Sequence, residues 1–294
     1  MGLNLETASA IARRLGLDER NLQIAPVTGG DIADATVIVG SDHRVFVKSM
    51  PLTQAGLLSA EADGLAALAA AAAIRVPRVL ARGQAETEEV VWLALEYLEL
   101  RPRDDQADRR LGEELAALHH HGSDHFGWHR HNYIGLMPQR NTPDENWARF
   151  FAGERLLPQL ERFCERYPEH LEIERMHHLI AAWHQLADDH RPESALLHGD
   201  LWSGNVACVG AGQPVIYDPS VHYGDRECDL AMAALFGGFA PSFQAAYESA
   251  WPLPEGWSQR RRYYQLYHLL NHANLFGGSY INRVCADINT LITH

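Results

Sequence analysis

Acidic and amide side chains recur at a fixed spacing between residues 198 and 218. His198-Gly199-Asp200 ends an apolar run, Asn205 follows five residues later, and the apolar run Val215-Ile216-Tyr217 leads to Asp218. Two apolar runs that each end in an Asp predict two extended segments that point acids into a shared cleft. This set suits phosphoryl transfer, which needs hard oxygen ligands for Mg²⁺ and an acid beside the acceptor hydroxyl.

The interval between Asp200 and Asn205 matches the kinase pattern in which an Asp orients the acceptor hydroxyl and an Asn binds metal. On this pattern Asp200 is the candidate catalytic base, and Asn205 and Asp218 are the candidate Mg²⁺ ligands. Gly199 stands where protein kinases have Arg, and Pro219-Ser220 replaces the Phe-Gly that follows their metal-binding Asp. Both differences favour a small-molecule kinase of the same fold over a protein kinase.

A kinase also needs a lysine under the nucleotide phosphates. The run Val45-Phe46-Val47-Lys48 resembles the strand that carries this lysine, and Glu61 lies thirteen residues later in a predicted helix. An ion pair between Lys48 and Glu61 would fix the ammonium group at the α- and β-phosphates of ATP. The alternative for each residue taken alone is a solvated surface charge.

Two further segments have a place in this scheme. Gly29 and Gly30 lie between the first two predicted strands, where glycine lets backbone N–H groups approach phosphates. A plain hairpin turn is the alternative. Glu96, Tyr97 and Leu98 follow the last strand of the first half, where a kinase hinge would bind the adenine edge; a simple linker is the alternative.

The pattern of the chain changes near Leu98. Before it, short β-branched runs predict an antiparallel five-stranded sheet with helices, and after it helical periodicity dominates. We expect strands at 22–27, 35–39, 44–48, 77–81 and 90–95, and helices at 4–17, 54–73, 106–121, 144–166, 170–190, 226–236, 240–250, 257–275 and 282–293. The fold class is α+β, with an N-terminal nucleotide-binding lobe at 1–98 and a mainly helical catalytic and acceptor-binding lobe at 99–294.

Composition limits the classes of partner. The 294 residues carry a net charge of −13 and are 46% hydrophobic, an ordinary globular mix that disfavours nucleic acid or an anionic membrane. The four cysteines form no Cys-x-x-Cys pair, and the start of the chain shows no secretory pattern. We therefore expect a cytoplasmic protein, a monomer or homodimer, with no membrane partner.

Several residues near the central motif are candidates for contact with the acceptor. Trp202 lies between the base and the metal-binding amide, where it would form a wall for the acceptor or pack in the core. Asp225, Arg226 and Glu227 could contact an amine or carboxylate of the acceptor, and His268 could line its pocket or pack. Asp229, at the start of a helix, is expected to be a structural acid that caps the helix and bonds backbone near the loop of Asp200, rather than a metal ligand.

At this point the chain resembles a known family. Four segments strongly resemble the fructosamine kinase (ketosamine 3-kinase) family, which belongs to the clan of aminoglycoside and choline kinases. They are His198 to Asn205, Tyr217 to Ser220, Tyr223 to Glu227 and Asp229 to Met232. Similar residues extend over nearly the whole chain, among them Trp147, Arg155 and the run from Tyr264 to His272. The segments around Trp202 and from Asp218 to Glu227 are the most specific.

The resemblance implies a protein-kinase-like two-lobed fold and ATP- and Mg²⁺-dependent phosphorylation of a ketosamine. The acceptor would be a sugar hydroxyl of a fructosamine, ribulosamine or erythrulosamine, free or protein-bound, and breakdown of the product would remove the sugar from the amine. Two alternatives stay open: a kinase for an aminoglycoside, choline or other sugar alcohol, and a nucleotide-binding pseudokinase. The complete set of Lys48, Glu61, Asp200, Asn205 and Asp218 disfavours the pseudokinase, since a binding module needs no transfer apparatus.

Overall fold

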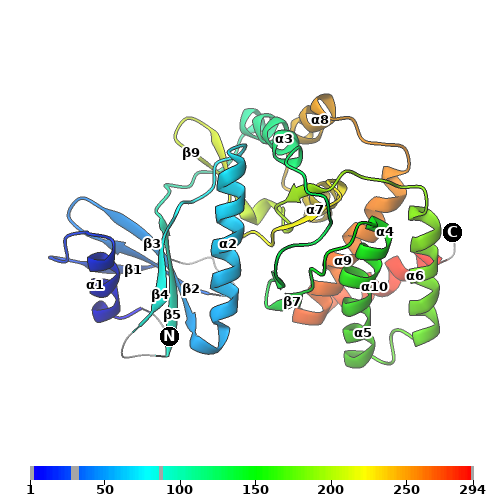
Figure 1. Ribbon diagram of the computed structural model, residues 1–294, viewed down its shortest axis with the longest axis horizontal. Coiled ribbons are helices and arrows are strands. Elements are labelled where there is room, and N and C mark those ends of the chain that lie inside the picture. Colours follow the sequence, from blue (N-terminus) through cyan, green and yellow to red (C-terminus); the bar gives the residue numbers. More distant parts are fainter. Residues whose placement is uncertain (1–2, 28–32, 86–88, 293–294) are drawn as a thin grey trace. The chain divides into compact units, whose positions relative to one another are not determined.

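A computed structural model describes residues 3–27, 33–85 and 89–292 of the chain (Figure 1). The contacts divide the chain into two compact units. The first is Met1–Arg103 together with Val206–Pro219, and the second is Asp104–Asn205 together with Ser220–His294. Within the described ranges, no helix is both long and apolar enough to cross a membrane.

The first unit is built on a five-stranded antiparallel sheet, as predicted. The strands lie in the order β1-β2-β3-β5-β4, and every neighbouring pair is antiparallel. Their bounds are β1 (Gln23–Pro26), β2 (Asp34–Val39), β3 (Arg44–Pro51), β4 (Val79–Gln84) and β5 (Val90–Glu96). The short loop connections and β-branched residues that predicted these strands also account for the antiparallel pairing.

Each face of this sheet packs on a helix. The apolar side of α1 (Leu5–Arg14) joins Val45 and Val47 of β3 in a buried cluster. Alternation along the strand then places Lys48 on the other face. That face packs on α2 (Ala55–Ala71), which follows the 3₁₀ turn η1 (Leu52–Gln54) and contacts β3, β4 and β5. The packing of α2 therefore decides which helical residue meets the lysine.

A hairpin from the second half of the chain completes the first unit. β9 (Val206–Val209) and β10 (Gln213–Ile216) are antiparallel, and Gly210 and Gly212 between them have positive φ. Cys208 pairs with Arg101 in an antiparallel bridge, and Val215 pairs with Arg75 in a parallel bridge. These bridges tie the hairpin, and with it Asp218, to the first unit.

The second unit is mainly helical. Its helices are α3 (Asp105–His119), α4 (Trp147–Phe150), α5 (Leu157–Arg166), α6 (Ile173–Ala187), α7 (Glu227–Phe236), α8 (Pro241–Ala250), α9 (Trp257–Phe276) and α10 (Ser279–Ile292). A π-helical segment η2 (Phe151–Leu156) joins α4 to α5, and η3 (Ser203–Asn205) is a 3₁₀ turn. Two short hairpins complete it: β6 (Asn132–Ile134) with β7 (Met137–Gln139), and β8 (Ala195–Leu197) with β11 (His222–Gly224).

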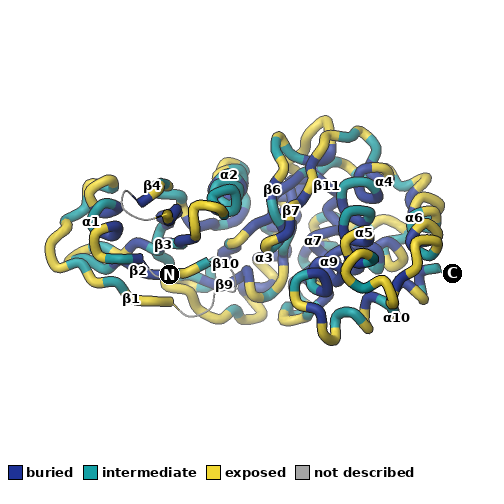
Figure 2. Tube along the Cα trace, turned by 90° about the horizontal axis from the view of Figure 1, so that it is seen from below, coloured by how far each residue is buried: buried dark blue, intermediate teal, exposed yellow. Residues whose placement is uncertain are grey.

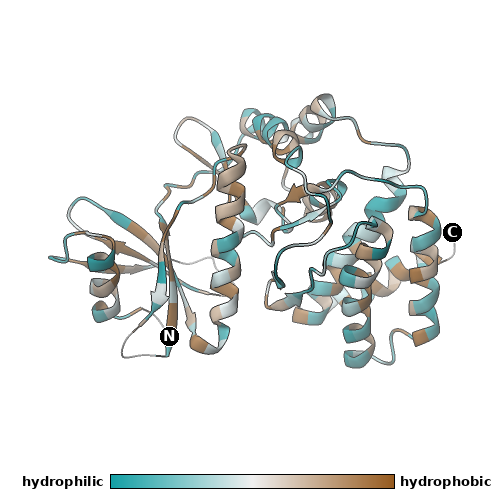
Figure 3. Ribbon diagram, viewed as in Figure 1, coloured by the Kyte–Doolittle hydropathy of each residue, from teal (hydrophilic) through white to brown (hydrophobic). Residues whose placement is uncertain are grey.

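Helix α9 is the centre of this unit. It contacts α5, α6, α7 and α10, and the tube of α9 is largely dark blue in Figure 2, which marks buried residues. Helix α6 lies at the periphery and shows hydrophilic and hydrophobic bands in turn (Figure 3). Its buried residues Met176, Leu179, Trp183 and Ala187 recur every three or four positions, as expected for a helix with one face on the core.

Several features of the second unit differ from the prediction. The β6–β7 hairpin was not expected, because strands of three residues are too short to show a period of two. The expected helix at 144–166 begins at Trp147 and contains the π-helical segment. The last helix begins at Ser279, three residues before the expected start. The four cysteines are free thiols, in agreement with their scattered positions.

Candidate active site

The first group of candidate site residues lies in the N-terminal unit and is centred on Lys48 of β3. Its Nζ donates to Glu61 Oε1 of α2 at 2.7 Å and to Asp218 Oδ1 at 2.5 Å. The predicted ion pair between Lys48 and Glu61 is therefore present. Asp218 reaches the same ammonium group from the segment that follows β10, although it lies 170 positions away in the sequence.

The three charges are not equally accessible to water. The side chains of Lys48 and Glu61 are 12% and 14% exposed, whereas that of Asp218 is 44% exposed. Burial alone would lower the pKa of Lys48, but the charges of Glu61 and Asp218 raise it above its ordinary value. Burial and the charge of Asp218 raise the pKa of Glu61, and Lys48 opposes part of that rise. Lys48 is thus a stable cation with one buried and one exposed carboxylate beside it.

The backbone of Asp218 is in an unusual conformation. Its φ is +57°, in the left-handed region, and it directly precedes Pro219. Asp is one of the few side chains that tolerate this region, and a following proline disfavours the right-handed helical alternative. Residues held in such conformations cluster at functional sites, so this geometry supports a special role for Asp218.

The second group lies in the loop that follows β8 in the second unit, residues 198–205, which we call the catalytic loop because it carries the predicted base Asp200. The carboxylate of Asp229, on α7, accepts hydrogen bonds from the backbone N–H groups of His198 at 2.7 Å and Gly199 at 2.8 Å. Its Oδ2 also accepts from His119 Nε2 at 3.2 Å. Burial opposes the charged form, but these donors hold the pKa of Asp229 below its ordinary value. Asp229 is confirmed as a structural acid that bonds the loop backbone.

Gly199 is required in this loop for two reasons. Its φ is +80°, and a Cβ added there would lie 2.2 Å from the carbonyl oxygen of Ser220. Ser220 lies close because it precedes β11, which pairs with β8, and its N–H donates to the carbonyl of His198 at 2.8 Å. No side chain fits at position 199, which explains why this chain cannot have the arginine of protein kinases there.

Asp200 and Asn205 are in direct contact in the second unit. Asn205 Nδ2 donates to the Asp200 backbone carbonyl at 3.0 Å and to its Oδ2 at 3.2 Å. The Asp200 N–H lies 3.2 Å from His198 Nδ1, which accepts it. Asn205 is buried and Asp200 is half-buried. The amide therefore fixes the Asp200 carboxylate, and its own oxygen Oδ1 is the atom suited to a cation.

Trp202 stands on the loop between these two residues. It is 36% exposed, one of the larger exposed apolar side chains in the described part of the chain. A Cβ added to Gly204 would lie 2.3 Å from the Trp202 ring, so the glycine makes room for the indole. The indole also makes an edge contact with Phe236, with ring centroids 6.5 Å apart.

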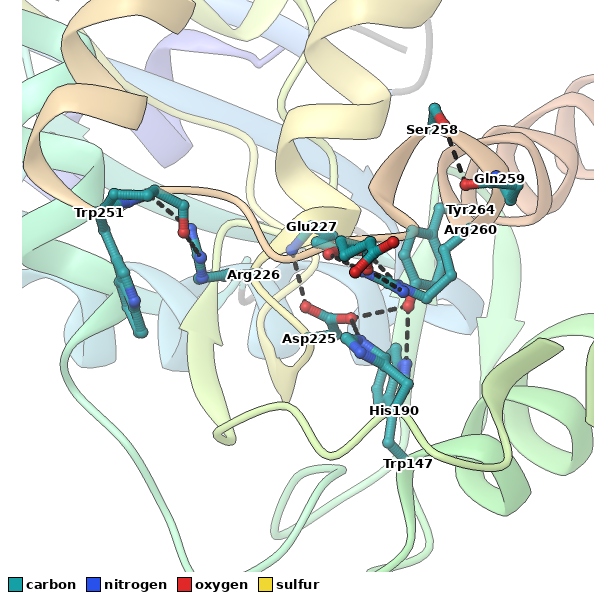
Figure 4. Close-up of polar contacts among 12 residues, drawn as sticks. Trp147, His190, Asp225, Arg226, Glu227, Trp251, Ser258, Gln259, Arg260 and Tyr264 are labelled. Atoms are coloured by element: carbon teal, nitrogen blue, oxygen red, sulfur yellow. Dashed lines mark hydrogen bonds and ion pairs between the residues drawn. The ribbon is translucent and has the colours of Figure 1, made fainter.

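Asp225 is buried and belongs to a hydrogen-bonded chain (Figure 4). Its Oδ2 lies 2.6 Å from His190 Nε2 and accepts from the Tyr264 hydroxyl at 2.7 Å, and Trp147 Nε1 donates to that hydroxyl at 2.9 Å. Burial would raise the pKa of Asp225, but the hydrogen bond and charge of His190 hold it below its ordinary value. The Asp225 carboxylate thus joins the segment after α6 to helix α9, and Tyr264 extends the hydrogen-bonded chain to Trp147 of α4.

Arg226 and Glu227 are also buried and engaged (Figure 4). Arg226 donates to the backbone carbonyls of Trp251 at 3.1 Å and Pro252 at 2.6 Å, and its guanidinium lies 4.1 Å from the Trp251 ring centroid. Glu227 forms a two-pronged ion pair with Arg260, at 2.6 and 2.9 Å. Burial and the charge of Asp225 raise the pKa of Glu227 to about 7, although Arg260 opposes the rise.

His190, Asp225 and Glu227 place possible metal-ligating atoms within 4.8 Å of one another. Two of them also line a cavity of about 770 Å³ in the second unit. Each carboxylate is already hydrogen-bonded, and the Arg260 guanidinium brings a positive charge to Glu227. A cation would have to displace these contacts, so we assign no metal to this cluster.

The predicted hinge residues follow β5. Glu96 Oε1 forms an ion pair with Arg75 Nη2 at 2.6 Å, so its carboxylate is engaged within the first unit. The Arg44 guanidinium lies 5.4 Å from the ring centroid of Tyr97. Tyr97 and Leu98 are half-buried. Their backbone, rather than the Glu96 side chain, is the part suited to an adenine edge. Gly29 and Gly30 lie outside the described residues.

His268, on α9, is buried behind the catalytic loop. It lines a small cavity of about 10 Å³ with Gly199 and Arg155 among others, about the space that one water needs. Burial lowers the pKa of His268 to about 3, so its ring is neutral. Within the described ranges His268 Nδ1 and Arg155 Nε have no hydrogen-bond partner. His268 therefore faces an enclosed space beneath Gly199.

Sequence reasoning missed the partners that hold the motif residues in place. His119 bonds Asp229, His190 bonds Asp225 and Arg260 pairs with Glu227. Nothing in the sequence marks His190 or Arg260, because each lies more than thirty residues from its partner and the pairing depends on tertiary packing.

Solved structures with a similar fold include an aminoglycoside phosphotransferase and a candidate fructosamine-3-kinase. A structure of a thermostable mutant of an aminoglycoside phosphotransferase, in ternary complex with AMP-PNP and hygromycin B, matches with a TM-score of 0.65 at 15% identity and covers 98% of both chains. The crystal structure of a candidate fructosamine-3-kinase from Haemophilus somnus matches with a TM-score of 0.88 at 28% identity, covering 97% of this chain and 96% of that one. The fold is thus α+β and protein-kinase-like with two lobes, as predicted.

The sequence comparisons identify the family of kinases to which the chain belongs. The model of the fructosamine kinase family matches residues 4–294. A probable ketoamine kinase of Synechocystis sp. is 42% identical over 277 residues, which cover 93% of this chain and 91% of that protein. The chain therefore belongs to the fructosamine kinase family, and the resemblance seen in its motifs is confirmed.

Proposed function

We propose that this chain is an ATP- and Mg²⁺-dependent kinase that phosphorylates a sugar hydroxyl of ketosamines. These are the fructosamine, ribulosamine or erythrulosamine adducts of amines, either free or protein-bound. The observation that carries the proposal is the contact of Lys48 with both Glu61 and Asp218, found in a chain of the fructosamine kinase family. Phosphoryl transfer uses a Lys–Glu ion pair and a metal-binding Asp beside it, whereas a binding module has no need of the full set.

Lys48 is the group that would bind the nucleotide phosphates. Glu61 holds its ammonium from the buried side, and the more exposed Asp218 gives way to phosphate oxygens on that ammonium when nucleotide binds. The backbone after β5, at Tyr97 and Leu98, would bind the adenine edge, and Gly29 and Gly30 would approach the phosphates. The aminoglycoside phosphotransferase of the same fold was solved with AMP-PNP, which supports ATP as the donor.

The donor atoms at Asn205 and Asp218 fit Mg²⁺. Both supply hard oxygens, the Asp218 carboxylate is 44% exposed, and the Asn205 amide nitrogen is already bound to Asp200, which turns its oxygen towards a ligand. We propose these two residues as the protein ligands of the ion. When bound, the ion would neutralise charge on the transferring phosphoryl group.

Asp200 is the proposed catalytic base. The Asp229 carboxylate holds the backbone of Gly199, directly before Asp200, and Asn205 fixes the Asp200 carboxylate. Asp200 would accept a hydrogen bond from the acceptor hydroxyl and orient its oxygen for attack on the γ-phosphorus of ATP. It would take the hydroxyl proton as the new P–O bond forms and the bond from that phosphorus to the ADP oxygen breaks, so that ADP leaves. Trp202 would form a wall for the sugar. The chain contributes mainly positioning and electrostatics.

The sequence left open whether four residues contact the acceptor: Asp225, Arg226, Glu227 and His268. Their contacts within the second unit support another proposal, that they position the loop and core around Asp200. We further propose a deglycation role in the cytoplasm, because the phosphorylated adduct would break down and release the amine.

The test is an acceptor panel with ATP and Mg²⁺, read as ADP release and as phosphate on the acceptor. The panel holds fructosyl-, ribulosyl- and erythrulosylamines, an aminoglycoside and choline, and the Asp200→Asn variant controls for contaminating kinases. We expect phosphorylated ketosamines from the wild type and none from the variant. Turnover of only the aminoglycoside or choline would contradict the acceptor class. Binding of Mg²⁺-ATP without turnover of any acceptor would indicate a pseudokinase.

A further inference from the structure

An aromatic strip extends away from the catalytic loop in the second unit. We define it as Trp202, Phe236, His272, Phe276 and Tyr280. Phe236 ends α7, His272 and Phe276 lie one turn apart on α9, and Tyr280 is on α10. Successive ring centroids are 6.5 Å apart from Trp202 to Phe236 and 4.9 Å from Phe236 to His272, and His272 lies 5.8 Å from Phe276 and 5.1 Å from Tyr280. The rings thus form one continuous series.

The two ends of the strip are open to solvent. Trp202 is 36% and Phe276 is 60% exposed, and the rings between them are half-buried. A contiguous series of partly exposed rings is uncommon on a protein surface unless something binds to it. Trp202 lies two residues after Asp200, so the strip begins near the proposed base. From there it continues over the end of α7, the last turns of α9 and the start of α10.

The strip is held in place by the fold. Gly238, just after Phe236, has a φ of +88°, and a Cβ added there would lie 2.6 Å from Ser203 Oγ. The end of α7 is therefore pressed against the catalytic loop that carries Trp202. His272 Nδ1–H donates to the His268 carbonyl at 2.8 Å, which fixes the orientation of the central ring. Binding here would need little reordering of side chains.

The chemistry of a ketosamine matches this surface. Such a molecule has a sugar, a secondary amine that is protonated near neutral pH, and an organic substituent on that amine. Aromatic faces attract cations, and the substituent is often an alkyl chain, which gains from apolar contact. With the sugar hydroxyl at Asp200, the ammonium group would come next along the molecule and the substituent last.

From this match, and resting on the proposed function, we propose that the aromatic strip binds the amine side of the acceptor. The sugar lies on Trp202, the ammonium group lies at the Phe236 end of that indole, and the substituent lies along His272 and Phe276. The enzyme would then favour ketosamines whose amine carries a long apolar or aromatic substituent, such as an N-blocked fructosyl-lysine, over those with a methyl group. Phe276 is the residue that determines this preference.

The experiment compares steady-state kinetics of three ketosamines, with methyl, hexyl and benzyl substituents on the amine, at saturating Mg²⁺-ATP. All three carry the sugar that the wild type phosphorylates best in the acceptor panel. The wild type should show a lower KM for the hexyl and benzyl compounds than for the methyl compound. Phe276→Ala should raise the KM of those two by about fivefold, leave the methyl compound within about twofold, and leave kcat unchanged. Phe236→Ala should raise the KM for all three, because it removes an aromatic face from the ammonium site.

Ile173→Ala is the matched control, because Ile173 is 58% exposed on α6 and lies outside the strip. Its kinetics should equal those of the wild type, and thermal melting should show that all variants are folded. If the wild type phosphorylates the methyl compound and Phe276→Ala affects all three KM values equally or not at all, the inference about the strip is wrong and the proposed function stands. If the wild type phosphorylates no ketosamine of the acceptor panel, both are overturned.

Discussion

Lys48 Nζ lies 2.5 Å from Asp218 Oδ1, so the ammonium proposed to bind phosphates contacts the carboxylate proposed to bind metal. Glu61 accepts from the same nitrogen at 2.7 Å. One ammonium group therefore contacts two carboxylates, of which Glu61 is the more buried and Asp218 the more exposed.

Lys48→Met should lower both stability and nucleotide affinity. Glu61 would lose its partner while staying buried, which should reduce the free energy of unfolding by about 1–3 kcal/mol. The double variant Lys48→Met, Glu61→Gln should recover part of this loss but none of the ATP turnover. Urea unfolding and ADP release measure the two effects. Equal stability of the single and double variants would contradict a buried ion pair.

Asp200→Asn should separate binding from transfer. The amide keeps the shape of the carboxylate but cannot take a proton, so kcat should fall by at least about 100-fold. Lys48 and its partners are untouched, so the affinity for Mg²⁺-ATP should stay within about threefold, as titration calorimetry can measure. A variant that keeps near-normal turnover would show that another group is the base.

Gly199→Ala should be far more damaging than Gly210→Ala. Both positions have positive φ, but a Cβ at 199 would lie 2.2 Å from the Ser220 carbonyl, whereas one at 210 meets no atom within 4 Å. Gly210→Ala should cost only the conformational penalty of about 1–2 kcal/mol and keep full kcat. Gly199→Ala should lose more stability and most activity. The comparison uses urea unfolding and steady-state kinetics, and equal effects would mean that the contact with Ser220 is unimportant.

Glu227 should make stability depend on pH. Its folded pKa of about 7 lies above the ordinary value of 4.5, so the folded chain holds the proton more tightly. Its contribution to stability is complete below pH 4.5 and is lost as the pH rises to about 7. The groups that face it, Asp225, His190 and Arg260, stay in place in Glu227→Gln.

That variant should therefore show a flatter dependence between pH 5 and 7, by up to about 1 kcal/mol per pH unit. Glu113→Gln, at an exposed position on α3, should keep the slope of the wild type. Urea unfolding at pH 5, 6 and 7 provides the measurement. Identical slopes for all three proteins would show that Glu227 does not titrate in this range.

Much of the fold could be predicted because local patterns were strong. The helix expected at 226–236 is α7 (Glu227–Phe236), and that expected at 257–275 is α9 (Trp257–Phe276). The β6–β7 hairpin and the π-helical segment could not be predicted, since three-residue strands and one altered helical turn leave no periodic trace. Tertiary packing, not propensity, decides both.

The candidate site divides in the same way. Lys48, Glu61, Asp200, Asn205 and Asp218 were found from spacing, because phosphoryl transfer constrains residue type and interval. The residues that hold them, such as His190 and Arg260, are set by contacts between distant segments and could be seen only in the structure. The spacing of residues thus predicted the candidate chemistry, and the structure showed which side chains hold those residues in position.

The hairpin formed by β9 and β10 has a consequence for biosynthesis. It belongs to the first unit, yet it is encoded more than a hundred residues after Arg103, where the first stretch of that unit ends. On the ribosome, the N-terminal sheet would emerge without the bridges to Arg75 and Arg101 and without Asp218 beside Lys48. A fragment ending at Arg103 should therefore be incompletely packed, and the final folding step of this unit must await translation of its last strand.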